Sequence, residues 1–91
     1  MTQHALTSLS NTEATRITPN GIHSGMDITL QNVNTEAYVF IGGEGVTTTN
    51  YGYRISPNNG WAIELPGKDA LYALSDIDGA NVAVLWTGLE P

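Results

Sequence analysis

The stretch Met26-Asp-Ile-Thr-Leu-Gln-Asn32 decides the fold, because apolar and polar side chains alternate along most of it. Met26, Ile28 and Leu30 fall on one face of an extended chain, and the residues between them are polar or charged. A period of two is typical of a β-strand with one buried face. Elsewhere in the chain, no segment keeps the apolar spacing of a helix through three turns. The pattern therefore predicts an all-β protein.

Other short runs rich in β-branched and aromatic residues end at turn signals built from Gly, Pro, Asn and Asp. The expected strands are residues 11–18, 26–32, 37–42, 53–56, 61–65, 70–75 and 81–87. The near-continuous hydrophobic run 37–42 predicts a central strand covered on both faces, and Asp78-Gly79 predicts a tight hairpin between the last two strands. Seven to eight strands in this length predict a small two-sheet antiparallel sandwich or jelly roll.

Length and cysteine content limit how this fold is stabilised. The chain has 91 residues and no cysteine, so we expect one domain over residues 11–91 and no disulfide framework. A core of this size gives a thin margin of stability, which favours extra burial against a partner. Residues 1–10 alternate weakly and carry no turn signal; they predict a flexible arm or an additional edge strand.

The charge balance limits the partners. Three basic residues against nine acidic ones give a formal net charge of −6. This charge disfavours nucleic acid and anionic membrane surfaces, whose binding depends on Lys and Arg. The first residues have no basic, apolar signal-peptide pattern, and we expect synthesis in a cytoplasm.

Motifs for catalysis or metal binding are weak. His4 and His23 are too far apart in sequence for a short metal-binding motif. The acidic segment 76–81 partly resembles a calcium loop, but a hairpin turn explains the same residues. The Gly-rich segment 42–45 is followed by β-branched residues rather than a helix start, so we expect a flexible connection and not a phosphate loop. We predict no catalytic residue, no metal and no cofactor.

The aromatic residues allow two interpretations. Trp61 and Trp86, at the start and end of strands, can cap the core or fill a subunit interface. Alternatively, Trp61, Tyr53 or Trp86 can stack on a sugar ring and bind a glycan.

Six segments in succession carry a family resemblance. They are Tyr38–Gly43, Gly45–Thr47, Gly52–Ile55, Trp61–Leu65, Leu71–Leu74 and Val82–Trp86. Together they resemble the small β-sandwich virion proteins of tailed bacteriophages, over roughly residues 25–87. The resemblance implies a capsid decoration or head-fibre-like protein on the outside of the head. Its partners would be the major capsid protein and itself, as a homotrimer. A tail or baseplate module that binds a host glycan is the alternative.

The contact residues expected under this interpretation come from the N-terminal segment and from two loop regions of the sandwich. They are Leu6, Leu9, Glu44, Val46, Thr48, Asn58 and Trp61.

Overall fold

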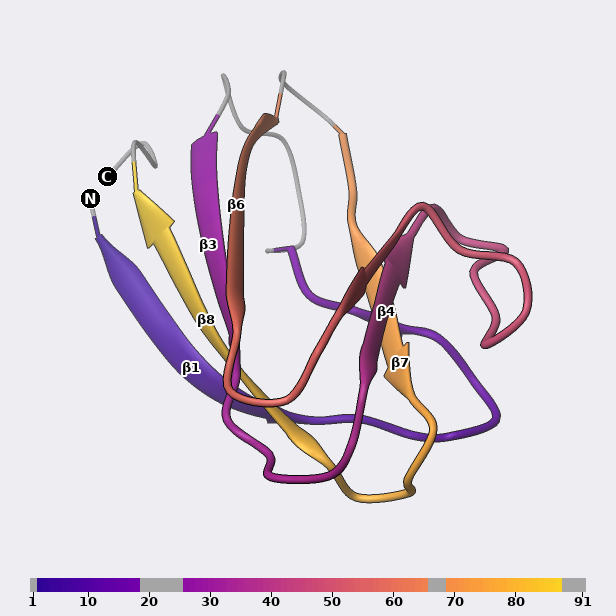
Figure 1. Ribbon diagram of the computed structural model, residues 1–91. Coiled ribbons are helices and arrows are strands. Elements are labelled where there is room, and N and C mark those ends of the chain that lie inside the picture. The colour runs from indigo at the N-terminus through magenta and orange to yellow at the C-terminus, as the bar shows by residue number, and fades with distance from the viewer. Residues whose placement is uncertain (1, 19–25, 66–68, 88–91) are drawn as a thin grey trace.

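The computed structural model describes residues 2–18, 26–65 and 69–87, and these contain strands but no helix. The strands are β1 (Gln3–Ser8), β2 (Thr15–Arg16), β3 (Met26–Asn32), β4 (Val39–Gly42), β5 (Tyr53–Ile55), β6 (Gly60–Leu65), β7 (Tyr72–Ser75) and β8 (Asn81–Thr87). They form two antiparallel sheets of four strands, in the orders β1-β8-β3-β6 and β2-β7-β4-β5 (Figure 1). The prediction of an all-β two-sheet sandwich is confirmed. No helix long enough to cross a membrane occurs in the described segments.

The strand pairing is nested. β4 pairs with β5, β3 with β6, β2 with β7 and β1 with β8, all antiparallel. The chain therefore resembles one long hairpin that reverses direction at residues 43–52. The hairpin is rolled up, so that successive strand pairs along it belong alternately to one sheet and to the other. The additional pairs β3–β8 and β4–β7 join the rolled halves. This arrangement is the jelly roll.

The prediction of a hairpin between the last two strands is wrong. The turn itself forms, with Ala80 N–H donating to Ile77 O at 3.3 Å and Gly79 at a φ of 83°. However, β7 and β8 belong to different sheets, so the turn carries the chain across the sandwich. Asp-Gly specifies a sharp reversal of direction, but the partner of each strand is decided by where its apolar face is buried.

The predicted burial patterns hold in the two strands that define the core. Along β3, buried and exposed residues alternate from end to end. In β4, which lies between β7 and β5, three successive residues are buried, as expected for a strand covered on both faces. The main core cluster comprises Leu9, Ile17, Met26, Ile28, Leu30, Val39, Ile41, Ile55, Leu65, Leu71, Ala73, Val82 and Val84.

Of the two possibilities for the N-terminal segment, the structure contains the edge strand. Residues 3–8 pair with β8, from Gln3 opposite Trp86 to Ser8 opposite Asn81. The strand expected over 11–18 is shorter than predicted and covers only Thr15–Arg16. Its first half bends instead, because Ser10 Oγ accepts hydrogen bonds from the amides of Thr12 and Glu13 at 3.0 and 3.2 Å.

A buried asparagine joins the two sheets at one end of the sandwich. Asn32, the last residue of β3, is fully buried. Its Nδ2 donates to Ala37 O at 2.8 Å and to Ile55 O at 2.9 Å, and Ile55 belongs to the opposite sheet. Its Oδ1 accepts from the backbone N–H and the Nδ2 of Asn34 at 3.0 and 2.7 Å. All side-chain donors and acceptors of Asn32 are therefore used.

The backbone of Asn32 also holds the loop that crosses to β6. Asn32 N–H donates to Asn59 O at 2.8 Å, and Asn58 N–H donates to Asn32 O at 2.9 Å. The loop contains a turn closed by Asn59 N–H to Ser56 O at 3.1 Å, with Asn58 at a φ of 64°. Proline followed by a residue with positive φ is the type II turn pattern.

Replacing Asn32 by alanine is expected to lower the free energy of unfolding by about 3 kcal/mol, because two buried carbonyl oxygens lose their donor. Urea unfolding monitored by circular dichroism measures the change. Asn59→Ala is the matched control: Asn59 is exposed and its side chain bonds only to Pro57 O at 3.2 Å. An equal loss of stability in both variants would contradict this role of Asn32.

Candidate binding surfaces

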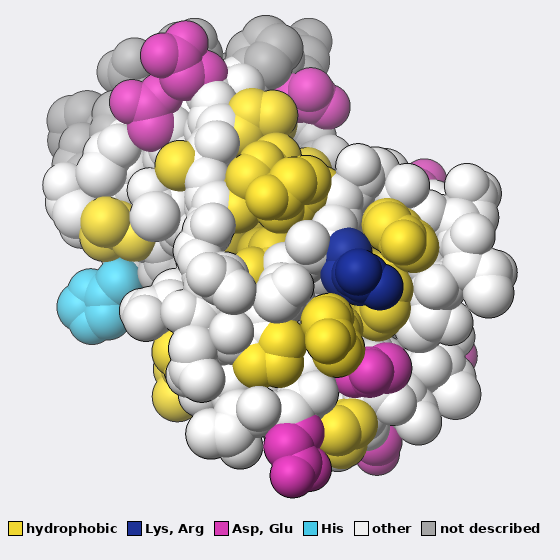
Figure 2. Space-filling view, viewed as in Figure 1, with side chains coloured by type: hydrophobic (Ala, Val, Ile, Leu, Met, Phe, Trp, Pro, Cys, Tyr) yellow, Lys and Arg dark blue, Asp and Glu magenta, His cyan; other side chains and the backbone are white. Residues whose placement is uncertain are grey.

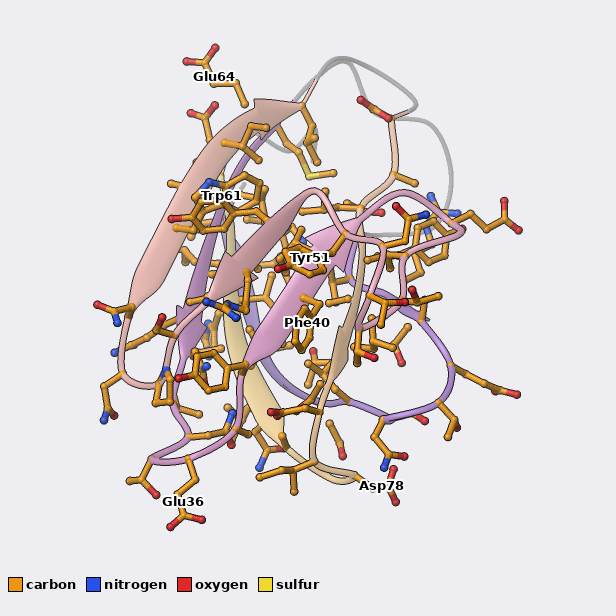
Figure 3. All side chains as sticks on the ribbon, turned by 45° about the vertical axis from the view of Figure 1, so that its right-hand side comes forward. Glu36, Phe40, Tyr51, Trp61, Glu64 and Asp78 are labelled. Atoms are coloured by element: carbon orange, nitrogen blue, oxygen red, sulfur yellow. The ribbon has the colours of Figure 1, made fainter. Side chains whose placement is uncertain are left out.

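An aromatic cleft of about 400 Å³ opens between the edge strands β5 and β6. Tyr53 of β5 and Trp61 of β6 stack across it, with ring centroids 5.2 Å apart and an interplanar angle of 17°. Figure 3 shows Trp61 extending from β6 toward the opposite sheet. Figure 2 shows hydrophobic side chains gathered in the space between the sheets. The remaining lining is apolar or backbone, apart from Asp69: Ile41, Gly42, Gly43, Gly52, Ile63, Leu65, Ala70 and Leu71.

The cleft is open because β5 is too short to cover β6. β5 has three residues and β6 has six. Ile63 pairs with Ile28 and so faces the core side of its sheet, yet it is 38 % exposed. Tyr53 lies two residues before the buried Ile55, on the same face of β5, and is 44 % exposed. Apolar side chains that point inward are therefore accessible from solvent along this side of the sandwich.

The arrangement suits a flat ligand with one apolar face. Each ring of the Tyr53–Trp61 pair uses one face for the stack, and the apolar walls provide further contact. Asp69 contributes a carboxylate to the lining, and Gly42, Gly43 and Gly52 contribute backbone. Apolar walls with a few polar groups at the margin are typical of small-molecule sites.

The Gly-rich loop beside the cleft, for which the sequence predicts a flexible connection, makes its own hydrogen bonds and apolar contacts. Val46 is buried against Phe40 and Leu74. Thr47 N–H donates to Asn50 O at 2.8 Å, and Thr47 Oγ1 accepts from Asn50 N–H at 2.9 Å. The loop thus carries its own small core, and Gly43 connects it directly to the aromatic cleft.

Trp86 and Trp61 both pack at the edge of the main core, as the first interpretation of the tryptophans predicts. Trp86 Nε1 donates to Ile17 O at 3.0 Å. Trp86 does not line the aromatic cleft, whereas Tyr53 and Trp61 do. Of the three aromatic residues named for glycan contact, Tyr53 and Trp61 therefore lie together at the cleft, and Trp86 packs against the core outside it.

A second apolar surface lies on the outer face of the β1-β8-β3-β6 sheet. A shallow groove of about 330 Å³ there is lined by His4, Ala5, Leu6, Thr29, Gln31, Ala83, Val84 and Leu85. Leu6 is 65 % exposed and Leu85 is 40 % exposed. None of these residues is Asp, Glu, Lys or Arg.

The acidic segment 76–81 is structural. Asp76 Oδ1 accepts a hydrogen bond from Tyr38 N–H at 2.9 Å, which ties the β7–β8 connection to the start of β4. Figure 3 shows Asp78 and Glu36 extending from the loops at this end. Among the described residues, no three His, Cys, Asp or Glu side chains come together as metal ligands. His23 lies outside the described residues.

The predicted contact residues do not form one surface. Leu9 and Val46 are buried, at 2 and 6 % exposure, and contribute to the two core clusters. Glu44 is exposed and Thr48 half-buried in the folded loop before β5, whereas exposed Asn58 lies in the turn after β5. The remaining two, Trp61 and Leu6, belong to the aromatic cleft and the outer face.

Two important features were not anticipated from the sequence. The Tyr53–Trp61 stack joins strands of different sheets, so no hairpin register predicts it. The role of Asn32 is also hidden, because an asparagine at the end of an alternating strand usually indicates a turn. The one available signal was its place on the same face as Met26, Ile28 and Leu30.

Comparison with protein families, curated proteins and solved structures found no match to this chain.

Replacing the buried Leu9 by alanine is expected to destabilise the protein by about 3 kcal/mol through loss of apolar contact and formation of a cavity. Ile77→Ala is the comparison, since Ile77 is 46 % exposed in the nearby loop and its truncation should cost under about 1 kcal/mol. Denaturant unfolding of both variants measures the difference. Equal midpoints would mean that Leu9 does not belong to the core.

Proposed function

We propose that this chain is a non-enzymatic structural protein of a tailed-bacteriophage virion, a capsid decoration protein that binds the outer surface of the head. The observation that carries the proposal is the apolar surface left exposed on so small a domain. Seven large hydrophobic side chains among the described residues have exposures of 38 to 65 %. Four of them gather at two surfaces, Tyr53 and Ile63 in the aromatic cleft and Leu6 and Leu85 on the outer face, and contiguous apolar exposure is typical of surfaces that a partner covers. A shell that binds many copies provides a permanent partner.

Charge and size support the same role. With a net charge of −6, the protein is repelled by packaged nucleic acid and stays soluble before assembly. Binding to the shell also adds stability to the folded state by mass action, which a 91-residue core without disulfides needs. The resemblance of residues 25–87 to small phage virion proteins supplies the virion context.

The contact with the shell is proposed at the folded loop before β5. Glu44 and Thr48 lie in this loop, which Val46 and the Thr47–Asn50 hydrogen bonds hold in shape. A pre-shaped loop loses little conformational entropy on binding. The aromatic cleft adjoins it through Gly43 and can enlarge the contact area.

Quantitative mass spectrometry of purified particles, with heads and tails separated, tests the assignment. We expect the protein in the head fraction at hundreds of copies per particle. Its presence only in tails, or at a few copies, would overturn the capsid role.

Binding of the purified protein to heads that lack it tests the contact. Glu44→Lys is expected to weaken binding at least ten-fold, because it reverses a charge at the proposed interface. Glu36→Lys makes the same change in the loop between β3 and β4, which lies outside the proposed contact, and should bind like the natural protein. Equal affinities of both variants would place the contact elsewhere on the surface.

A second candidate is recognition of a host glycan, favoured by the Tyr53–Trp61 stack in an open apolar cleft. Aromatic faces bind the apolar face of sugar rings. The chain has two tryptophans, so Trp86→Phe leaves Trp61 as the only tryptophan emitter. Titration of that variant with host cell-wall oligosaccharide should quench Trp61 with saturation.

Adding Tyr53→Ala to the Trp86→Phe variant should weaken its binding of the oligosaccharide at least ten-fold. Tyr51→Ala is its control, because Tyr51 packs on Phe40, outside the lining of the aromatic cleft, with ring centroids 5.0 Å apart. An absence of saturable quenching would remove the glycan candidate and leave the capsid role intact.

A further inference from the structure

β1 is an outermost strand of its sheet among the described strands, and it lacks the usual protection of a sheet edge. Natural edges are protected by lysine, proline, bulges or very short strands. β1 has six residues, Gln-His-Ala-Leu-Thr-Ser, with no proline, lysine, arginine or acidic residue. Its register with β8 runs without interruption from Gln3 to Ser8. β1 can therefore accept another strand.

The backbone groups available for that strand can be identified. Leu9 N–H donates to Ala80 O at 2.7 Å, toward the β8 side. Backbone groups alternate in direction along a strand, so those of Ser8, Leu6 and His4 point away from β8. The side chains of the same three residues are exposed. A strand added here would bond to these three residues and lie next to the Leu6 side chain.

The charge distribution indicates which strand. Two copies of a chain with a net charge of −6 repel each other over most approaches. Residues 2–12 and 81–87 contain no acidic side chain, so the β1–β8 side is an uncharged surface on an acidic protein. The opposite edge of this sheet, β6, instead carries Glu64 directly across from Asp27. Of the two edges of this sheet, β1 therefore offers a second copy the lesser repulsion.

We propose that two copies of the protein associate through β1, antiparallel about a two-fold axis that passes close to Leu6. The two four-stranded sheets would become one sheet of eight strands. In this register Leu6 faces Leu6 of the second copy, and His4 faces Ser8. Leu6 is the most exposed of the large hydrophobic side chains described, at 65 %, and this pairing covers it.

The pairing also accounts for the small neighbour of Leu6. Ala83 lies opposite Leu6 on β8 and is half-buried. The row across the joined sheet would run Ala83, Leu6, Leu6 and Ala83, so that two large side chains meet at the axis between two small ones. This self-complementary order is what a two-fold interface requires, because the same surface is used twice.

The pairing goes beyond the proposed function and is independent of it. It differs from the homotrimer implied by the family resemblance, since it gives a two-fold axis. Size-exclusion chromatography with light scattering at several concentrations distinguishes the two. We expect a mass of two chains that falls to one on dilution. A single chain at all concentrations, or a mass of three chains, would overturn the proposal.

Single cysteines locate the contact, because the chain has no cysteine of its own. Paired Cα atoms at a hydrogen-bonded position are about 5.5 Å apart, within disulfide range. Leu6→Cys should therefore form a covalent dimer under mild oxidation. Leu85→Cys, on the same outer face but on β8, should not. A crosslink at residue 85 as efficient as that at residue 6 would instead indicate that the sheets stack face to face.

Leu6→Asp tests the contact without a crosslink, because it places two carboxylates opposite each other across the axis. We expect the dissociation constant of the dimer to rise at least ten-fold. Leu85→Asp is the matched control, and its dimer dissociation constant should stay within about two-fold of that of the natural protein. Far-UV circular dichroism of dilute samples confirms that both variants fold. If Leu6→Asp fails to fold, the cysteine pair still decides the proposal, and equal weakening by both aspartates would overturn it.

Discussion

The hydrogen bonds of Asn32 are the constraint on which the rest of the structure depends. One side chain at the end of β3 bonds to a residue before β4 and to a residue of β5. Through Asn34, the same network reaches Asn81 at the start of β8, by Nδ2 to Asn81 O at 2.8 Å and Asn81 N–H to Oδ1 at 3.2 Å. A buried amide that belongs to a strand of one sheet and bonds to a strand of the other fixes their relative position in a way that apolar packing alone does not.

Much of the fold follows from local sequence, and most of the site does not. The alternation in 26–32 and the apolar run 37–42 were sufficient to predict the core strands, because burial on one or two faces leaves a direct pattern. Strand order was not predictable, as the Asp78-Gly79 turn illustrates: a turn residue sets a local φ and carries no information about the sheet that comes next. The Tyr53–Trp61 cleft depends on strand order and was therefore hidden as well.

The two exposed apolar surfaces have different physical origins. The cleft exists because a three-residue strand faces a six-residue one, so inward-facing side chains remain uncovered. The outer face exists because Leu6, Ala83 and Leu85 occupy positions where alternation would place polar residues. The first is a concave site that suits a ligand or a narrow contact, and the second is a shallow groove next to the β1 edge, where the proposed pairing would place Leu6 of a second copy. The proposed roles, binding to a shell and pairing of two copies, would use one surface each.

The nested pairing has a consequence for the order of folding. The β4–β5 pair closes the shortest loop, and each later pair brings together strands that the previous one has already moved closer, so the entropic cost of closure is spread over successive steps. We expect β1 to join last, because its partner β8 is the final strand of the nested series. β1, the first strand to be synthesised, would then stay unpaired until the rest of the sandwich has folded, and the nascent chain would expose both β1 and the uncovered edge of β8 during that time.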